Sequence, residues 1–73
     1  MKAKEMFEEL GFEYQENEIN IKYYKEYTDC YDESYILEID FRLIEKKIYS
    51  DFSIDMHLLK AINKQVEELG WND

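Results

Sequence analysis

The sequence predicts an α+β domain of two layers, in which a helix at each end of the chain covers one face of a sheet of three or four antiparallel strands. Three observations predict this fold. Apolar residues recur at helical spacing near both ends, each of the two glycines follows one of these segments, and the apolar period between them is two residues. The 73 residues contain no proline and no low-complexity linker, so we expect a single domain over residues 1–73.

A first helix is predicted over residues 2–10. Its apolar residues recur at the spacing of one helical face, and they are Ala3, Met6, Phe7 and Leu10. Gly11 follows, and a glycine at this place favours the left-handed conformation that ends a helix. Phe12 is then expected to fold back onto Phe7.

The middle of the chain shows the alternation that is typical of strands with one buried face. The two clearest strands have as inward residues Ile19, Ile21 and Tyr23 in the first and Tyr35, Leu37, Ile39, Phe41 and Leu43 in the second. A further strand over residues 47–52, after a turn at residues 45–46, would bury Ile48 and Phe52. The pattern leaves open whether residues 12–15 join the sheet as an additional strand.

A second helix is predicted near the end of the chain, with Ser53 as its N-cap and Asp55 in its positive first turn. Its apolar stripe consists of Ile54, Leu58, Leu59, Ile62, Val66 and Leu69. Gly70 ends this helix, and Trp71 can fold back onto Val66. Because both glycines of the chain end helices, none remains for a phosphate-binding loop, and nucleotide-binding folds of that kind are excluded.

Helices on one face of an antiparallel sheet can leave the other face in water. We expect this open face to display aromatic and acidic side chains, namely Tyr24, Glu26, Ile36, Glu38, Asp40, Tyr49 and Asp51. The connection predicted over residues 26–35 adds three tyrosines and three acids, namely Tyr27, Tyr31, Tyr35, Asp29, Asp32 and Glu33. Tyrosine is favoured at interfaces because one end is apolar and the other forms hydrogen bonds. The same tyrosines would serve equally well as a lid over the edge of a thin core.

The chain has 18 acidic and 9 basic residues and a formal net charge of −9. Two windows, residues 5–18 and 26–40, each hold six acids and no base. Direct binding to nucleic acid is therefore not expected, because it depends on Lys and Arg side chains that displace counterions from phosphates. A basic protein partner is favoured by long-range attraction, although the same charge also keeps a small domain soluble.

Residue types with catalytic or metal chemistry are scarce. The only cysteine and the only histidine, Cys30 and His57, fall on different predicted elements, and the acids around Cys30 disfavour a thiolate. The segment with Asp29 and Asp32 lacks the alternating ligands and central glycine of a calcium loop, and zinc would need a cluster of cysteines and histidines. We therefore expect no enzymatic activity, no metal and no cofactor.

The features that bear on location point to the cytoplasm. A single cysteine cannot form an internal disulfide, which fits a reducing compartment. The first ten residues lack the apolar core of a signal peptide, and the longest apolar run, residues 35–37, is far too short to cross a membrane.

The segments KEMFEELGF and LLKAINKQVEELGW, with tyrosine-rich strands between them, resemble small uncharacterised proteins of phages and mobile elements in low-GC Gram-positive bacteria. The resemblance implies a cytoplasmic setting of host and phage. Small acidic phage proteins are often inhibitors, and some mimic DNA by placing carboxylates where phosphates would lie.

Together these observations predict a small acidic interaction protein without enzymatic activity, which acts on a basic, nucleic-acid-binding host protein as an inhibitor or DNA mimic. The alternative is a structural or assembly module that works as a homo-oligomer, because a thin core and open edge strands favour self-pairing. The protein would then be a monomer in the first case and at least a homodimer in the second.

Overall fold

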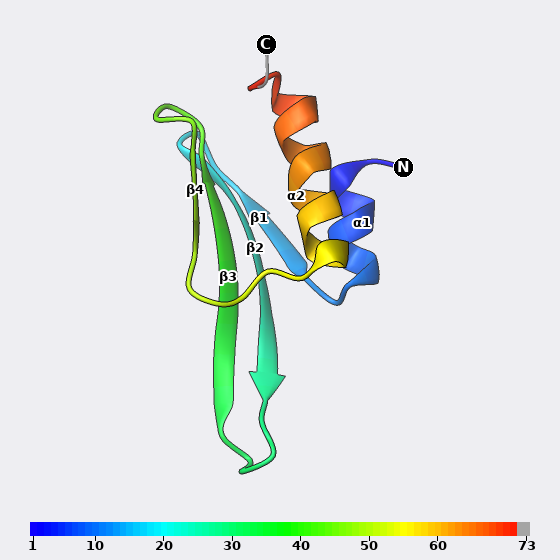
Figure 1. The fold of residues 1–73 in the computed structure, drawn as a ribbon. Helices are drawn as coiled ribbons and strands as arrows, with labels where there is room; N and C mark the ends of the chain where they lie inside the picture. The colour runs from blue at the N-terminus through cyan, green and yellow to red at the C-terminus, as the bar shows by residue number, and fades with distance from the viewer. Residues whose placement is uncertain (72–73) are drawn as a thin grey trace.

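The computed structural model describes residues 1–71, which form two helices and one antiparallel sheet of four strands. The elements are α1 (Ala3–Glu9), β1 (Glu13–Glu16), β2 (Asn20–Thr28), β3 (Ser34–Arg42), β4 (Lys47–Ser50) and α2 (Met56–Leu69). Neighbouring strands along the chain are neighbours in the sheet, and both helices pack on the same face of it (Figure 1). The predicted α+β fold is confirmed, and the open question about the first strand is settled in favour of β1.

Both helices end as the two glycines predict. Gly11 has a φ of 92° and Gly70 a φ of 73°, a left-handed conformation that costs glycine little. After α1, the N–H of Phe12 donates to the carbonyl of Phe7 at 3.0 Å, and the two rings meet edge to face with centroids 5.8 Å apart. After α2, the N–H of Trp71 donates over 3.2 Å to the carbonyl five residues earlier.

The start of α2 differs from the prediction. The N-cap is Asp55 rather than Ser53, and its carboxylate accepts a hydrogen bond from the N–H of Leu58 at 2.8 Å. Aspartate is among the strongest N-cap residues, so the helix begins two residues later than predicted. Ile54 therefore precedes the helix and is 42% exposed, and Leu59 is also partly exposed, at 37%.

The core lies between the helices and the part of the sheet nearest to them. Phe7 of α1 stacks on Tyr23 of β2 with ring centroids 3.7 Å apart, and Phe41 of β3 meets Phe7 edge to face at 6.2 Å. The hydroxyl of Tyr23 donates to the side-chain oxygen of Gln65 at 2.6 Å, which links β2 to α2 inside the core. The strand residues that were correctly predicted to be buried include Ile21, Tyr23, Ile39 and Phe41.

Three predictions of buried strand residues are wrong, and they concern Ile19, Tyr35 and Ile48. Tyr35 is 45% exposed because it lies on β3 beyond the part of the sheet that the helices cover. Ile19 is 54% exposed because it lies in the turn before β2, where the side-chain oxygen of Asn17 accepts hydrogen bonds from the N–H groups of Ile19 and Asn20. Ile48 is also exposed, since it belongs to the edge strand β4, which has a neighbouring strand on one side only.

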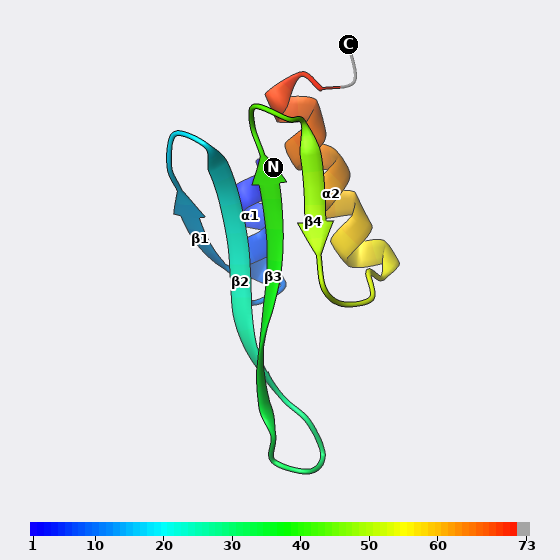
Figure 2. The ribbon, with the colours of Figure 1, turned by 90° about the vertical axis from the view of Figure 1, so that its left-hand side faces the viewer.

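β2 and β3 are longer than the rest of the sheet. β1 pairs with β2 over residues 21–24 only, and β4 pairs with β3 over residues 39–42 only. The remainder of β2 and β3 extends beyond the helices as a two-stranded arm, residues 25–38, which we call the projecting hairpin (Figure 2). Half of the predicted connection over residues 26–35 is therefore strand, and the loop is confined to residues 29–33.

Candidate interaction surface

The open face of the sheet is the side without helices (Figure 2). On β2, β3 and β4 it carries the side chains that alternate with the core residues. The predicted residues on this face are Tyr24, Glu26, Ile36, Glu38, Asp40 and Tyr49, with Asp51 just beyond the end of β4. Cross-strand register places Tyr24 opposite Glu38 and Asp40 opposite Tyr49, so the structure brings these residues together.

Two cations share the open face with the carboxylates. The Nζ of Lys22 lies 3.7 Å from Oε1 of Glu38, and the Nε of Arg42 donates to Oδ2 of Asp40 at 2.9 Å. Oδ1 of Asp40 also accepts a hydrogen bond of 2.8 Å from the side-chain nitrogen Nδ2 of Asn20. Lys22 and Arg42 were not among the residues predicted for this face, although they alternate with the buried residues in the same way as the acids do.

A shallow hollow of about 310 Å³ lies on this open face. It is lined by Glu38, Asp40, Tyr49, Ser50 and Asp51. The guanidinium of Arg42 lies 5.5 Å from the centroid of the Tyr49 ring, at the distance of a cation–π contact. No ion pair involves Asp51 within residues 1–71, so the hollow can accept hydrogen bonds from an incoming basic side chain.

The loop at the tip of the projecting hairpin is organised by Asp29. Its carboxylate accepts hydrogen bonds from the N–H groups of Tyr31 at 2.8 Å and Glu33 at 3.0 Å, and from the hydroxyl of Tyr35 at 3.0 Å. These donors, the amide of Glu33 first, hold the pKa of Asp29 below its ordinary value. Asp32 adopts a φ of 63°, which aspartate tolerates better than most residues. Asp29 thus fixes the conformation of the loop through its hydrogen bonds and also adds a negative charge to it.

Tyr27 and Tyr35 lie on the helix side of the projecting hairpin, opposite to Tyr24. Their rings stack with centroids 6.5 Å apart and remain 50% and 45% exposed. The twelve predicted partner-binding residues therefore do not form one surface. They divide into the open face, the tip with Asp29, Tyr31, Asp32 and Glu33, and Tyr27 on the reverse of the hairpin.

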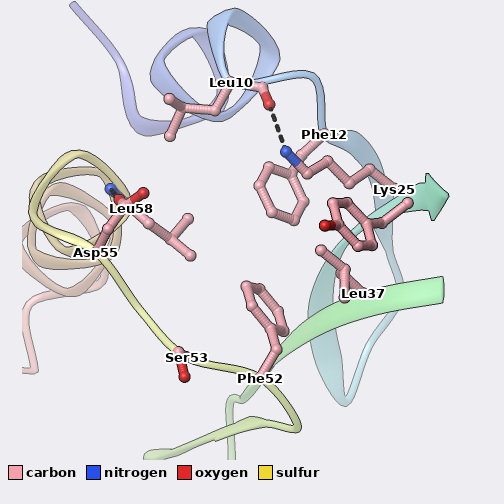
Figure 3. Close-up of a pocket in the computed structure, with 9 residues that line it drawn as sticks. Leu10, Phe12, Lys25, Leu37, Phe52, Ser53, Asp55 and Leu58 are labelled. Atoms are coloured by element: carbon pink, nitrogen blue, oxygen red, sulfur yellow. Dashed lines mark hydrogen bonds between the residues drawn. The ribbon is translucent and has the colours of Figure 1, made fainter. Parts of the chain in front are cut away.

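A pocket of about 230 Å³ lies at the base of the projecting hairpin, between the end of α1 and the start of α2 (Figure 3). Its apolar walls are Leu10, Phe12, Leu37, Phe52 and Leu58, and its polar rim consists of Lys25, Tyr27, Ser53 and Asp55. We call it the hairpin pocket. The Nζ of Lys25 donates to the carbonyl of Leu10 at 3.1 Å and lies 4.8 Å from the centroid of the Phe12 ring. This pocket was not predicted from the sequence, in which its only signal is Lys25, a charged residue at an inward position of β2.

The residues with catalytic or metal chemistry are dispersed. Cys30 is exposed at the tip of the hairpin, and His57 is exposed in the first turn of α2. Among the described residues, no group of three or more His, Cys, Asp or Glu side chains is arranged to hold a metal ion. Neither α1 nor α2 has the length and apolar composition needed to span a bilayer.

Comparisons with protein families, curated proteins and solved structures gave no match to this chain.

Proposed function

We propose that this protein is a non-enzymatic interaction protein that binds a basic protein partner through the open face of its sheet. The observation that carries the proposal is the uncovered face of β2, β3 and β4, whose hollow combines three carboxylates with the half-exposed ring of Tyr49. Aromatic side chains are enriched at protein interfaces, and complementary charge speeds the encounter of two partners.

The ion pairs on this face refine what the partner must offer. Asp40 is held by hydrogen bonds from Arg42 and Asn20. Glu38 forms only a loose and partly exposed ion pair with Lys22, and both cations reduce the free charge of the face. Asp51 and Glu26 form no ion pair among the described residues and supply the charge that attracts a partner. Ile36 is exposed opposite Glu26 and adds apolar area to the contact.

The DNA-mimic version of the proposal requires carboxylates that stand free where phosphates would lie. The pairing of Lys22 with Glu38 and of Arg42 with Asp40 weakens that version relative to a mixed polar and aromatic contact. A competition assay separates the two. Duplex DNA displaces a DNA mimic from a host DNA-binding protein at equal salt, whereas a contact away from the DNA site persists.

The central test is a pair of matched double charge reversals. Glu38→Lys with Asp51→Lys changes the open face, and Glu8→Lys with Glu9→Lys changes α1 by the same amount. Each pair takes the formal charge from −9 to −5, because each reversal adds two units. The tagged proteins are used to capture partners from a lysate of a low-GC Gram-positive bacterium at low and moderate salt, and the affinity for the captured protein is then measured by calorimetry.

We expect the open-face pair to weaken binding by about tenfold or more and the α1 pair to leave it within about threefold at moderate salt, where distant charges are screened. Equal losses in the two variants would mean that net charge alone attracts the partner. If both variants kept the wild-type affinity, the open face would not be part of the binding site.

The alternative function, assembly with further copies of the same chain, has one observation in its favour. On the projecting hairpin, residues 25–28 of β2 and 34–38 of β3 each have a strand partner on one side only within the described chain. Such edges can pair with another strand. Sedimentation at micromolar to millimolar concentration tests this, and a monomer over the whole range rejects it.

A further inference from the structure

The hairpin pocket has the size of a single side chain. Its volume of about 230 Å³ falls below the roughly 300–1,000 Å³ that is usual for small-molecule sites. Pockets that take one anchoring side chain are common at the centre of protein interfaces. The pocket is open and its walls are mainly apolar, so it suits a side chain such as leucine or phenylalanine.

Beyond the pocket, a strip of exposed aromatic surface leads along the helix side of the projecting hairpin to its tip. Leu37 lines the pocket, Tyr35 is the next inward residue of β3 and stacks on Tyr27, and Glu33 follows at the loop. A strand advances about 3.3 Å per residue, so Leu37 and Glu33 lie about 13 Å apart along the hairpin.

The two ends of this strip differ in charge. At the pocket, Lys25 is engaged by the carbonyl of Leu10 and by the face of Phe12. At the tip, the carboxylates of Asp29 and Glu33 both lie within hydrogen-bond distance of the Tyr35 hydroxyl, which holds them beside the strip. One hydroxyl proton serves only one of them at a time, so the pair keeps its negative charge and most of its acceptor capacity. The strip is therefore apolar at one end and acidic at the other.

We propose that the hairpin pocket and this strip bind an extended segment of a partner protein, with a leucine or phenylalanine side chain in the pocket and a lysine or arginine about four residues away at Asp29 and Glu33. The spacing follows from the 13 Å between the two ends, divided by the rise of an extended chain. The site lies on the opposite side of the sheet from the open face, so it stands independently of the function proposed above.

The charge of the chain selects this occupant over a second copy. Each copy carries a formal charge of −9, and the tip that would enter the pocket of a neighbour is itself acidic. Like charges oppose such an approach, whereas a basic segment is attracted to the same tip.

The test is a peptide-display selection from random nine-residue peptides, with the wild-type protein and two tryptophan variants as the targets. Ser53→Trp places a large ring at the rim of the hairpin pocket, and Ser34→Trp is the matched control on the open-face side of the same hairpin. Both serines are exposed, and thermal melts confirm that each variant is folded. Selected peptides are then titrated into the ¹⁵N-labelled protein, and amide shifts are followed by NMR.

We expect the wild type and Ser34→Trp to select peptides with a large apolar residue and a basic residue four positions away. These peptides should shift the amides of Leu37, Phe52 and Leu58, and their affinity should fall about tenfold or more in Ser53→Trp. A Glu33→Lys variant should lose the preference for the basic residue and keep the apolar one.

Three results would overturn the proposal. The first is a selection that yields no binding peptides. The second is a set of peptides that lack this pattern or that bind Ser53→Trp as tightly as the wild type. The third is a change in the same amide shifts with protein concentration when no peptide is present. The last result would assign the strip to a second copy. None of them bears on the open face, whose charge-reversal test uses different residues.

Discussion

The hydrogen bond between Tyr23 and Gln65 offers a direct test of how the core is built. Tyr23 is 1% exposed and Gln65 is 6% exposed, and their side chains meet at 2.6 Å between β2 and α2. Within the described residues, no buried side-chain nitrogen or oxygen lacks a hydrogen-bond partner, and the Tyr23 hydroxyl and the Gln65 side-chain oxygen satisfy each other. We predict that Tyr23→Phe destabilises the fold although it removes only one oxygen atom.

The magnitude follows from the atom that is left behind. Tyr23→Phe removes the donor and leaves the side-chain oxygen of Gln65 buried without a partner, which costs about 1–3 kcal/mol. Gln65→Met orphans the tyrosine hydroxyl at a similar cost. The double variant removes both polar groups, so its loss should be below about 1 kcal/mol. With about 2 kcal/mol lost in each single variant, the coupling energy of the cycle should be about 3 kcal/mol.

The assay is urea unfolding followed by circular dichroism on the four proteins of the cycle. In a domain of 73 residues each kcal/mol moves the melting temperature by about 4–8 °C, so thermal melts give an independent reading. Losses that simply add in the double variant would refute the reasoning, because they would show that neither side chain depends on the other for its hydrogen bond.

Three further predictions concern the helix ends and the tyrosines. Asp55→Ala should lower the free energy of unfolding by about 1 kcal/mol through loss of the N-cap, while Ser53→Ala should leave it nearly unchanged, and urea unfolding distinguishes them. Gly11→Ala should cost about 1–2 kcal/mol by the same measurement, because a Cβ there meets only Lys25 Cδ at 3.8 Å and the penalty comes from the backbone φ of 92°. Burial, with Glu16 nearby, raises the pKa of Tyr14 to about 12, and burial also raises the pKa of Tyr23. The unfolded chain ionises first, so unfolding midpoints should be constant from neutral pH to about pH 10 and fall as the pH rises from 10 towards 12; midpoints that stay constant to pH 12 would contradict this.

Local signals in the sequence were sufficient for the elements and their ends. Gly11 and Gly70 ended helices as predicted, and alternation correctly assigned the inward side of β2 and β3 at Tyr23, Ile39 and Phe41. These features depend on residues close in sequence, where backbone preference and period leave few choices.

Tyr35 and Ile48 were misassigned for the same reason. Alternation defines which way a side chain points but carries no information on whether anything covers it. Tyr35 and Ile48 point to the inward side as the period requires, yet they lie where cover is incomplete. On the open face, the alternation also does not show which charges pair. Lys22 and Arg42 point to the same side of the sheet as Glu38 and Asp40 and form ion pairs with them. A pairing across strands depends on register, which the sequence of one strand does not contain.

The extent of cover can be argued from element lengths. The 14 residues of α2 span about 21 Å at about 1.5 Å per residue, whereas the nine residues of β2 span about 30 Å at about 3.3 Å per residue. β2 is thus longer than α2 by roughly 9 Å, or about three residues, and β2 and β3 extend past the N-terminal end of α2 (Figure 1). This one difference in length accounts for three features. They are the projecting hairpin, the exposed rings of Tyr27 and Tyr35, and the hairpin pocket at the point where the helices stop covering the sheet. A lengthened α2 that reached over Leu37 would bury these tyrosines and close the pocket, so the short helix is what leaves the proposed peptide site accessible.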